Sequence, residues 1–233
     1  MRLPRILLTR RLSTLSAVTL LAVAAILSTG GARAGEVKIA VAANFTQAAK
    51  DIALLFERET GHKAVLSFGS TGQIYTQIAK GAPFEVFLAA DRARPQKAGT
   101  EGLGIEQTRF TYATGKIVLY SRNPDLIEGP STLKKGGFSK IAIANPVTAP
   151  YGAAAIEAME KLGAYAALKD KIVQGNNIAQ THQFVQSGNA EVGFVALSQV
   201  APHQDGSRWP VPQTLYTPIA QDAILLTVGK DNP

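Results

Sequence analysis

The feature that most constrains this chain is the regular alternation, from Val37 onward, of short apolar runs with segments of helical periodicity. We expect strands at 36–43, 62–69 and 84–90, with helices at 44–61 and 71–82 between them. Strands that alternate with helices are typical of a parallel sheet whose faces are covered by those helices. The chain is therefore predicted to have an α/β fold.

A second series of the same kind follows a strand expected at 109–121. Its predicted elements are a strand at 140–146, a helix at 150–165, a strand at 170–176, a helix at 178–189 and a strand at 191–197 before a proline-rich loop. Two series predict two lobes, each a mostly parallel sheet flanked by helices. The expected boundaries are 35–114 for the first lobe, 115–218 for the second lobe, and 219–233 for a strand that returns to the first lobe.

The expected helix at 44–61 has one apolar face and a clear end. Ala48, Ile52, Leu55 and Phe56 recur at helical spacing, and Gly61 is a typical stop. The segment is therefore predicted to be a helix with these four residues on one face.

Residues 1–34 have the order of a secretory signal peptide. Five arginines and no acidic residue accompany an apolar core, and Ala32-Arg33-Ala34 predicts cleavage after Ala34 and export. A membrane anchor is the alternative, but a spanning helix needs about 18 apolar residues and no stop-transfer segment follows the core. Without this leader, 24 − 5 = 19 basic residues face 17 acidic ones, a charge of +2 that disfavours a nucleic-acid partner.

Residue types that would support catalysis are scarce. The chain has no cysteine, which excludes thiol catalysis and iron–sulfur clusters, and only His62, His182 and His203, whose spacing disfavours a zinc site. Neither a phosphate-binding P-loop nor a G-x-G-x-x-G pattern is present. An exported hydrolase of small phosphate or sulfate esters would need a nucleophile with a base, or a metal cluster. We therefore expect that the protein is not an enzyme.

Four strand-to-helix junctions share small or neutral residues and lack basic ones. They are Ala43-Asn44, the segment with Gly69, Ser70, Thr71 and Gly72, the segment with Pro150, Tyr151 and Gly152, and Asn177-Ile178-Ala179. Each offers unpaired N–H groups and the positive end of a helix dipole, which suit a small, fully ionised oxyanion. Helix capping alone is the alternative at any single junction. Their recurrence, two in each lobe, favours a binding cleft.

Three stretches of the chain point to a known family. They are VAANFTQAAKDIALLFERETGHKAVLSFGSTGQIYTQIAKGAPFEVFLAAD, AIANPVTAPYGAAAIEAMEKLG and VQGNNIAQTHQFVQSGNAEVGFVALSQV. These stretches resemble the periplasmic molybdate-binding proteins of ABC importers. The resemblance spans essentially the whole chain after residue 34. It implies a two-lobed, type II periplasmic-binding-protein fold that closes on molybdate or tungstate in the periplasm and delivers it to a membrane permease. It also implies a monomer without a cofactor, in which molybdenum is present only as the oxyanion.

Carried onto this chain, the ligand contacts of that family are Ala43, Asn44, Thr71, Tyr151 and Ile178, with Ser70, Gly69, Gly72 and Gly152 in supporting positions. Ala196 stands where many members have a contacting tyrosine, so it is left out of the expected site.

The main functional alternative is a receptor for another tetrahedral oxyanion such as sulfate, whose exclusion depends on cavity size.

Two further expectations concern single positions. Asp91 is expected to cap a turn or helix start, and the alternative is that it helps hold the closed form. The sequence Asp231-Asn232-Pro233 is typical of a helix start, so we expect a longer form to continue for about 20–25 residues with a helix that covers an apolar patch of the first lobe.

Overall fold

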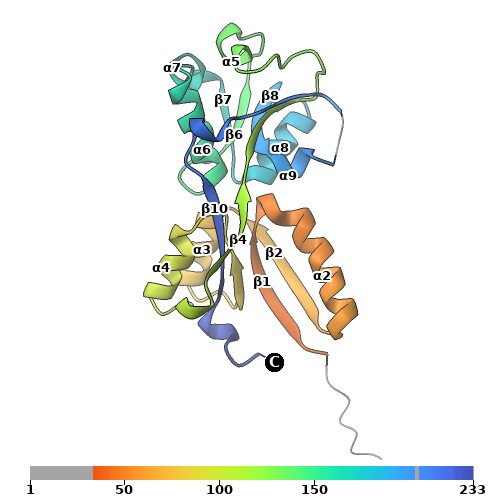
Figure 1. The fold of residues 1–233 in the computed structure, drawn as a ribbon, viewed down its shortest axis with the longest axis vertical. Coiled ribbons are helices and arrows are strands. Elements are labelled where there is room, and N and C mark those ends of the chain that lie inside the picture. Colours follow the sequence, from red (N-terminus) through yellow and green to blue (C-terminus); the bar gives the residue numbers. More distant parts are fainter. Residues whose placement is uncertain (1–33, 203–204, 233) are drawn as a thin grey trace, which may run out of the picture. The chain divides into compact units, whose positions relative to one another are not determined.

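Two five-stranded sheets organise the chain in the computed structural model, which describes residues 34–202 and 205–232 (Figure 1). The expected leader up to residue 33 and His203 lie outside the described residues. The first sheet has the order β2-β1-β3-β10-β4. Its strands are β1 (Glu36–Ala42), β2 (Lys63–Gly69), β3 (Val86–Leu88), β4 (Phe110–Gly115) and β10 (Ile219–Leu225). Strands β2, β1 and β3 are parallel, whereas β10 is antiparallel to β3 and β4.

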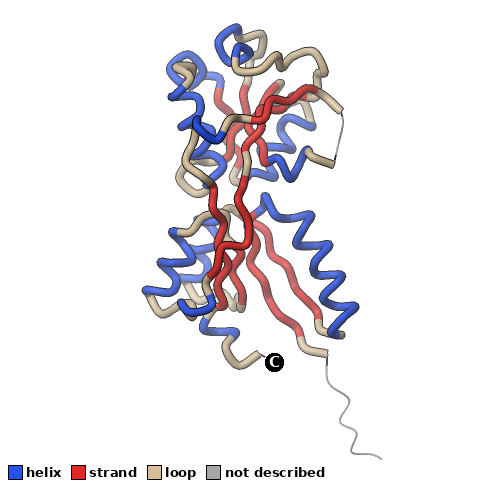
Figure 2. Tube along the Cα trace, viewed as in Figure 1, coloured by secondary structure: helices blue, strands red, loops and turns tan. Residues whose placement is uncertain are grey.

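The helices of this first lobe cover both faces of its sheet (Figure 2). They are α2 (Thr46–Thr60), α3 (Thr71–Ala79) and α4 (Ala93–Thr100), with short 3-10 turns η1 (Ala43–Phe45), η2 (Glu106–Thr108) and η5 (Thr227–Gly229). Residues of α3 and α4 pack with Phe87 and Ile224 in a buried cluster. Helix α2 lies over the opposite face and ends at Gly61 in the left-handed conformation, as its sequence predicts.

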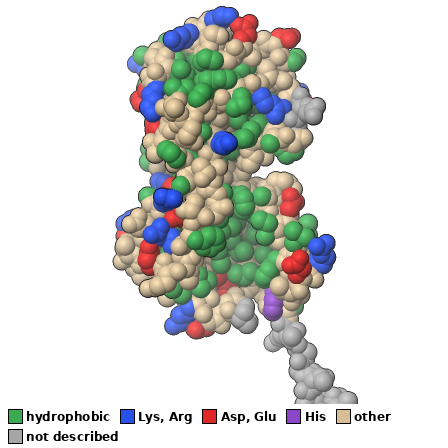
Figure 3. Space-filling model, viewed as in Figure 1, with side chains coloured by type: hydrophobic (Ala, Val, Ile, Leu, Met, Phe, Trp, Pro, Cys, Tyr) green, Lys and Arg blue, Asp and Glu red, His purple; other side chains and the backbone are tan. Residues whose placement is uncertain are grey.

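The predicted apolar face of α2 is only partly buried. Ala49 is its one fully buried residue, while Ile52 is 54% exposed and Leu55 is 45% exposed. Between α2 and the sheet runs an apolar groove of about 350 Å³, to which Ile52 and Phe56 contribute. Hydrophobic side chains gather on this lobe in Figure 3. The sheet therefore covers only part of the predicted apolar face of α2.

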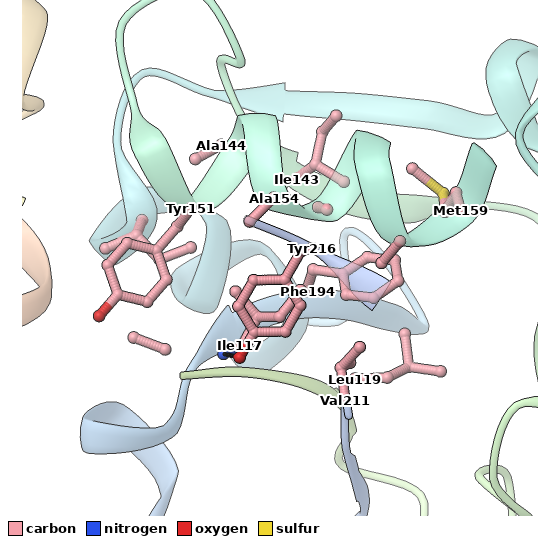
Figure 4. Close-up of a cluster of buried hydrophobic side chains, with 14 of the residues drawn as sticks. Ile117, Leu119, Ile143, Ala144, Tyr151, Ala154, Met159, Phe194, Val211 and Tyr216 are labelled. Atoms are coloured by element: carbon pink, nitrogen blue, oxygen red, sulfur yellow. Dashed lines mark hydrogen bonds between the residues drawn. The ribbon is translucent and has the colours of Figure 1, made fainter. Parts of the chain in front are cut away.

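The second lobe has the sheet order β7-β6-β8-β5-β9. Its elements are β5 (Ile117–Ser121), α5 (Ser131–Lys135), β6 (Ile141–Ala144), α6 (Pro150–Lys161), α7 (Tyr165–Leu168), η3 (Lys169–Lys171), β7 (Ile172–Gly175), α8 (Ile178–Gln186), β8 (Val192–Ala196), α9 (Leu197–Val200), β9 (Ser207–Pro210) and η4 (Gln213–Leu215). Figure 4 shows its larger core, in which Ile143, Phe194 and Tyr216 pack beside α6. Val185 of α8 and Val200 of α9 belong to a second core with Val118.

The chain passes between the lobes at Lys116. The prediction of a single strand at 109–121 is wrong, because this segment forms two strands. Strand β4 ends at Gly115 in the first sheet, and β5 begins at Ile117 in the second sheet. Gly115 and Lys116 interrupt the strand-forming residues at this point, but two such residues do not by themselves reveal a change of sheet. Strand β9 lies in the segment expected to be a loop, and it pairs with β5.

Among the described residues, no helix is both long enough and apolar enough to cross a membrane.

Candidate functional site

All five residues expected to contact a ligand line one cavity, which the two lobes share. The residues around it are Ala42, Ala43, Asn44, Gly69, Ser70, Thr71 and Ala90 from the first lobe, and Ala149, Pro150, Tyr151, Asn177 and Ile178 from the second lobe. The cavity volume is only about 10 Å³, counted as the space that the centre of a water molecule can occupy. This is close to the minimum that a buried water needs, so the lobes leave little free space at this site.

Two hydroxyl groups of the first lobe are available to a ligand. The Thr71 Oγ1 accepts a 2.9 Å hydrogen bond from the Ala90 N–H, so the hydroxyl proton of Thr71 is free to be donated. Ser70 is 3% exposed, and its Oγ has no hydrogen-bond partner among the described residues. Ser70 occupies the N-cap position of α3 without a side-chain capping bond. Capping therefore does not account for either hydroxyl.

Tyr151 supplies the hydroxyl of the second lobe. Its ring is buried at the edge of the core of that lobe, and its hydroxyl points away from the neighbouring side chains labelled in Figure 4. Burial raises the pKa of Tyr151 well above its ordinary value, although hydrogen bonds from Gln221 and Asn44 oppose this shift. The phenol is therefore neutral at physiological pH and can act as a donor.

Gly152 and Asn177 position the two helix starts of the second lobe. A Cβ atom on Gly152 would lie 2.0 Å from the Ala144 carbonyl oxygen, so only glycine lets α6 begin this close to β6. The Asn177 Oδ1 accepts 3.0 Å hydrogen bonds from the backbone N–H groups of Ala179 and Gln180. This cap does not engage the N–H of Ile178, which lines the cavity.

The electrostatics of the cavity come from neutral groups. Helices α3, α6 and α8 all begin at it, and each contributes partial positive charge from its N-terminus. None of the described residues that line the cavity is charged. Within the part of the chain that the structure describes, no cluster of three or more His, Asp or Glu side chains could hold a metal ion. The arrangement is suited to a small anion that accepts hydrogen bonds on every side.

Hydrogen bonds beside the cavity connect the two lobes. The Gly72 N–H donates to the Thr148 carbonyl oxygen at 2.9 Å, and the Ser198 Oγ donates to the Asn44 carbonyl oxygen at 2.8 Å. A Cβ atom on Gly72 would lie 3.0 Å from the Thr148 Cα. Gly72 therefore allows the lobes to approach closely, and its N–H bonds to the opposite lobe.

Asp91 has two roles in the structure rather than capping alone. Its Oδ1 accepts a 2.9 Å hydrogen bond from the Arg94 N–H, as expected of a cap at the start of α4. Its Oδ2 forms an ion pair with the Arg94 guanidinium. The same guanidinium donates through Nη2 to the Val147 carbonyl oxygen of the second lobe at 3.0 Å. Asp91 thus also orients a contact between the lobes.

Sequence reasoning missed Gln221, a residue of β10 that is 2% exposed. Its side chain forms hydrogen bonds with Asn44 and Tyr151, both of which line the cavity. A pair of polar residues, Gln221 and Asp222, interrupts an otherwise apolar strand, and this interruption was the available signal.

Comparison with known proteins agrees with this architecture. The family model of bacterial extracellular solute-binding proteins matches residues 37–233. The molybdate-binding protein ModA of Azotobacter vinelandii is 57% identical over 208 residues, which cover 87% of this chain and 82% of that protein. The molybdate-binding protein ModA of Rhodobacter capsulatus is 53% identical over 201 residues, covering 86% of this chain and 80% of that protein.

A solved structure of an Azotobacter vinelandii periplasmic molybdate-binding protein is also similar, with a TM-score of 0.80 at 39% identity. The similarity covers 84% of this chain and 87% of that one. Both the sequence match and the fold therefore point to the same assignment. This chain belongs to the family of bacterial extracellular solute-binding proteins.

Proposed function

We propose that this protein captures molybdate, and also tungstate, in the cavity between its lobes and delivers the anion to the permease of an ABC importer. The observation that carries the proposal is the cavity itself: it is small, it lacks charged residues, and three helix N-termini meet at it. The relatives named as molybdate-binding proteins, at 57% and 53% identity, support the choice of anion.

The proposed contacts come from both lobes. Backbone N–H groups at Ala43, Asn44 and Ile178 and the hydroxyl groups of Thr71 and Tyr151 would each donate to an anion oxygen. The Ser70 hydroxyl, expected from the sequence in a supporting position, would be a further donor because it is buried without a partner among the described residues. These donors suit a fully ionised oxyanion, because every oxygen can accept and none carries a proton. Hydrogen phosphate carries a proton, and no carboxylate among the described residues lines the cavity to accept it. Burying that proton unpaired would cost about 1–3 kcal/mol.

The remaining parts of the proposal follow from this role. The protein would work in the periplasm after cleavage behind Ala34, as a monomer and without a cofactor, by opening and closing its lobes rather than by catalysis. Titration calorimetry with molybdate, tungstate, sulfate and phosphate tests the proposal directly.

Ser70→Ala is expected to weaken molybdate binding by about tenfold, since a hydrogen bond to a charged group contributes roughly 1.5–3 kcal/mol. The melting temperature should stay unchanged, because the Ser70 Oγ has no partner among the described residues. Calorimetry and thermal unfolding of the same preparation measure both quantities. Unchanged affinity would show that Ser70 lies beside the anion without bonding to it.

Molybdate affinity is expected to stay nearly constant between about pH 6 and 9, because histidine is the side chain that ordinarily titrates in this range and none is a proposed contact. Burial raises the pKa of Tyr151, so its phenol keeps its proton throughout the range. Calorimetry across this range measures the profile. Affinity that follows a pKa near 6.5 would instead implicate a histidine outside the proposed contacts.

A further inference from the structure

One buried amide joins the two halves of the cavity. The Gln221 Oε1 accepts a 2.8 Å hydrogen bond from the Asn44 Nδ2, and the Gln221 Nε2 donates to the Tyr151 Oη at 3.2 Å. Asn44 belongs to the first lobe and Tyr151 to the second. Gln221 does not itself line the cavity, so it can act on a ligand only through these two neighbours.

A β-bulge places this amide. The register between β10 and β4 shifts between Gln221 and Asp222, and both residues are buried. The Asp222 carboxylate accepts hydrogen bonds from Arg109 Nη1 at 2.8 Å and from Thr111 Oγ1 at 2.6 Å. The extra residue is Tyr112 of β4, since Gln221 pairs with Ala113 and Asp222 with Thr111. Bulges of this kind change the local twist next to functional sites. The Asp222 contacts hold β10 against β4 here, while Gln221 reaches toward the cavity.

The space for the contact comes from Gly115. A Cβ atom at this position would lie 2.3 Å from the Tyr151 Oη and 2.8 Å from the Gln221 Nε2. Any larger residue at position 115 would push the side chains of Tyr151 and Gln221 apart.

The direction of the hydrogen bond decides where the phenol proton goes. A tyrosine hydroxyl has one proton and can also accept hydrogen bonds. While the Gln221 Nε2 donates to the Tyr151 Oη, the proton of Tyr151 is left for another acceptor. The opposite end of the amide favours this orientation, because Oε1 faces both Asn44 Nδ2 and the Tyr112 Oη, which lies 3.1 Å away. If the amide were rotated by 180°, its oxygen would instead accept a hydrogen bond from the Tyr151 hydroxyl.

We propose that Gln221 is a positioning residue that holds the Tyr151 hydroxyl with its proton directed into the cavity, where it is donated to a tetrahedral oxyanion. Since Gln221 and Tyr151 belong to different lobes, this orientation exists only when the lobes are together. The inference rests on the proposed function, because it names a group that acts on the same anion.

A double-mutant cycle between Gln221→Met and Tyr151→Phe tests the proposal, with molybdate affinity measured by calorimetry. Tyr151→Phe should weaken binding by about 10- to 100-fold, and Gln221→Met by about tenfold. The double variant should bind no more than about threefold more weakly than Tyr151→Phe alone, because Gln221 acts through the hydroxyl that is already absent. Gln186→Met is the matched control. The Gln186 Nε2 donates a 3.1 Å hydrogen bond to the Tyr120 Oη, and neither residue lines the cavity.

Gln221→Asn provides a second variant if Gln221→Met does not fold. It keeps an amide in the buried strand but is one methylene too short to bridge both neighbours, so it should also bind about tenfold more weakly. Wild-type affinity in either Gln221 variant, or losses that multiply in the double variant, would overturn the inference while leaving the proposed function intact. If wild type binds another oxyanion but not molybdate, the proposed function fails and the cycle is run with that anion. If wild type binds no oxyanion, both fail.

Discussion

Gly152→Ala is expected to lower the free energy of unfolding by about 3 kcal/mol, the upper end of the usual cost of overpacking. The added methyl group would meet the Ala144 carbonyl oxygen at 2.0 Å and its carbon at 2.7 Å, and neither backbone atom can move without shifting β6. The start of α6 must therefore move away and take Tyr151 with it. Molybdate affinity should fall together with stability.

Gly99→Ala is the control for this prediction. It also adds a methyl group to a helix, but the atom it meets most closely, at 1.9 Å, is a carboxylate oxygen at the end of the Glu106 side chain, which can turn aside without moving the backbone. Chemical denaturation should show this variant to be nearly as stable as wild type. Equal stability of both variants would mean that α6 does not depend on its close contact with β6.

Thr71→Ala is expected to weaken molybdate binding by about 10- to 100-fold, through loss of a hydrogen bond to a charged group. It should also cost stability, because the Thr71 Oγ1 is the acceptor for the N–H of Ala90, which is 2% exposed. Leaving that donor buried and unpaired costs about 1–3 kcal/mol. Calorimetry and denaturation measure the two effects separately.

Two further variants isolate the Thr71 hydroxyl. Thr71→Ser keeps it and should retain most of both properties. Thr76→Ala removes a hydroxyl from the same helix, where it donates to the Gly72 carbonyl oxygen at an exposed position, and affinity should not change. Wild-type affinity in Thr71→Ala would remove Thr71 from the proposed contacts and leave it a purely structural residue.

The sequence predicted the elements that carry the cavity because those elements obey local rules. Helices α3, α6 and α8 each follow a strand and begin close to the predicted positions, at Thr71, Pro150 and Ile178. Periodicity and helix-start residues are local signals, and they identified the four junctions at the cavity; the five individual contact residues came from the family resemblance, and the structure brings them together.

The sequence did not predict features that depend on contacts between distant segments. The expected lobe boundary at 114/115 lies next to Lys116, but the division of the expected strand at 109–121 into β4 and β5 was not predicted, because it depends on which distant strands each part pairs with. The role of Gln221 depends on Asn44, which lies 177 residues away in the chain, and on Tyr151, which lies 70 residues away. The apolar face of α2 shows a related limit: its periodicity predicted the helix correctly but not how much of that face is covered.

The central claim is that a neutral cavity between the lobes binds a fully ionised tetrahedral oxyanion, and titration of the wild-type protein tests it most directly. Separate calorimetric titrations with molybdate, tungstate, sulfate and phosphate at one pH and ionic strength should show tight binding of molybdate and tungstate with one anion per chain. Phosphate should bind at least about tenfold more weakly, which corresponds to 1.4 kcal/mol and lies within the cost of burying its unpaired proton. Absence of molybdate binding, or phosphate binding as tight as that of molybdate, would contradict the account.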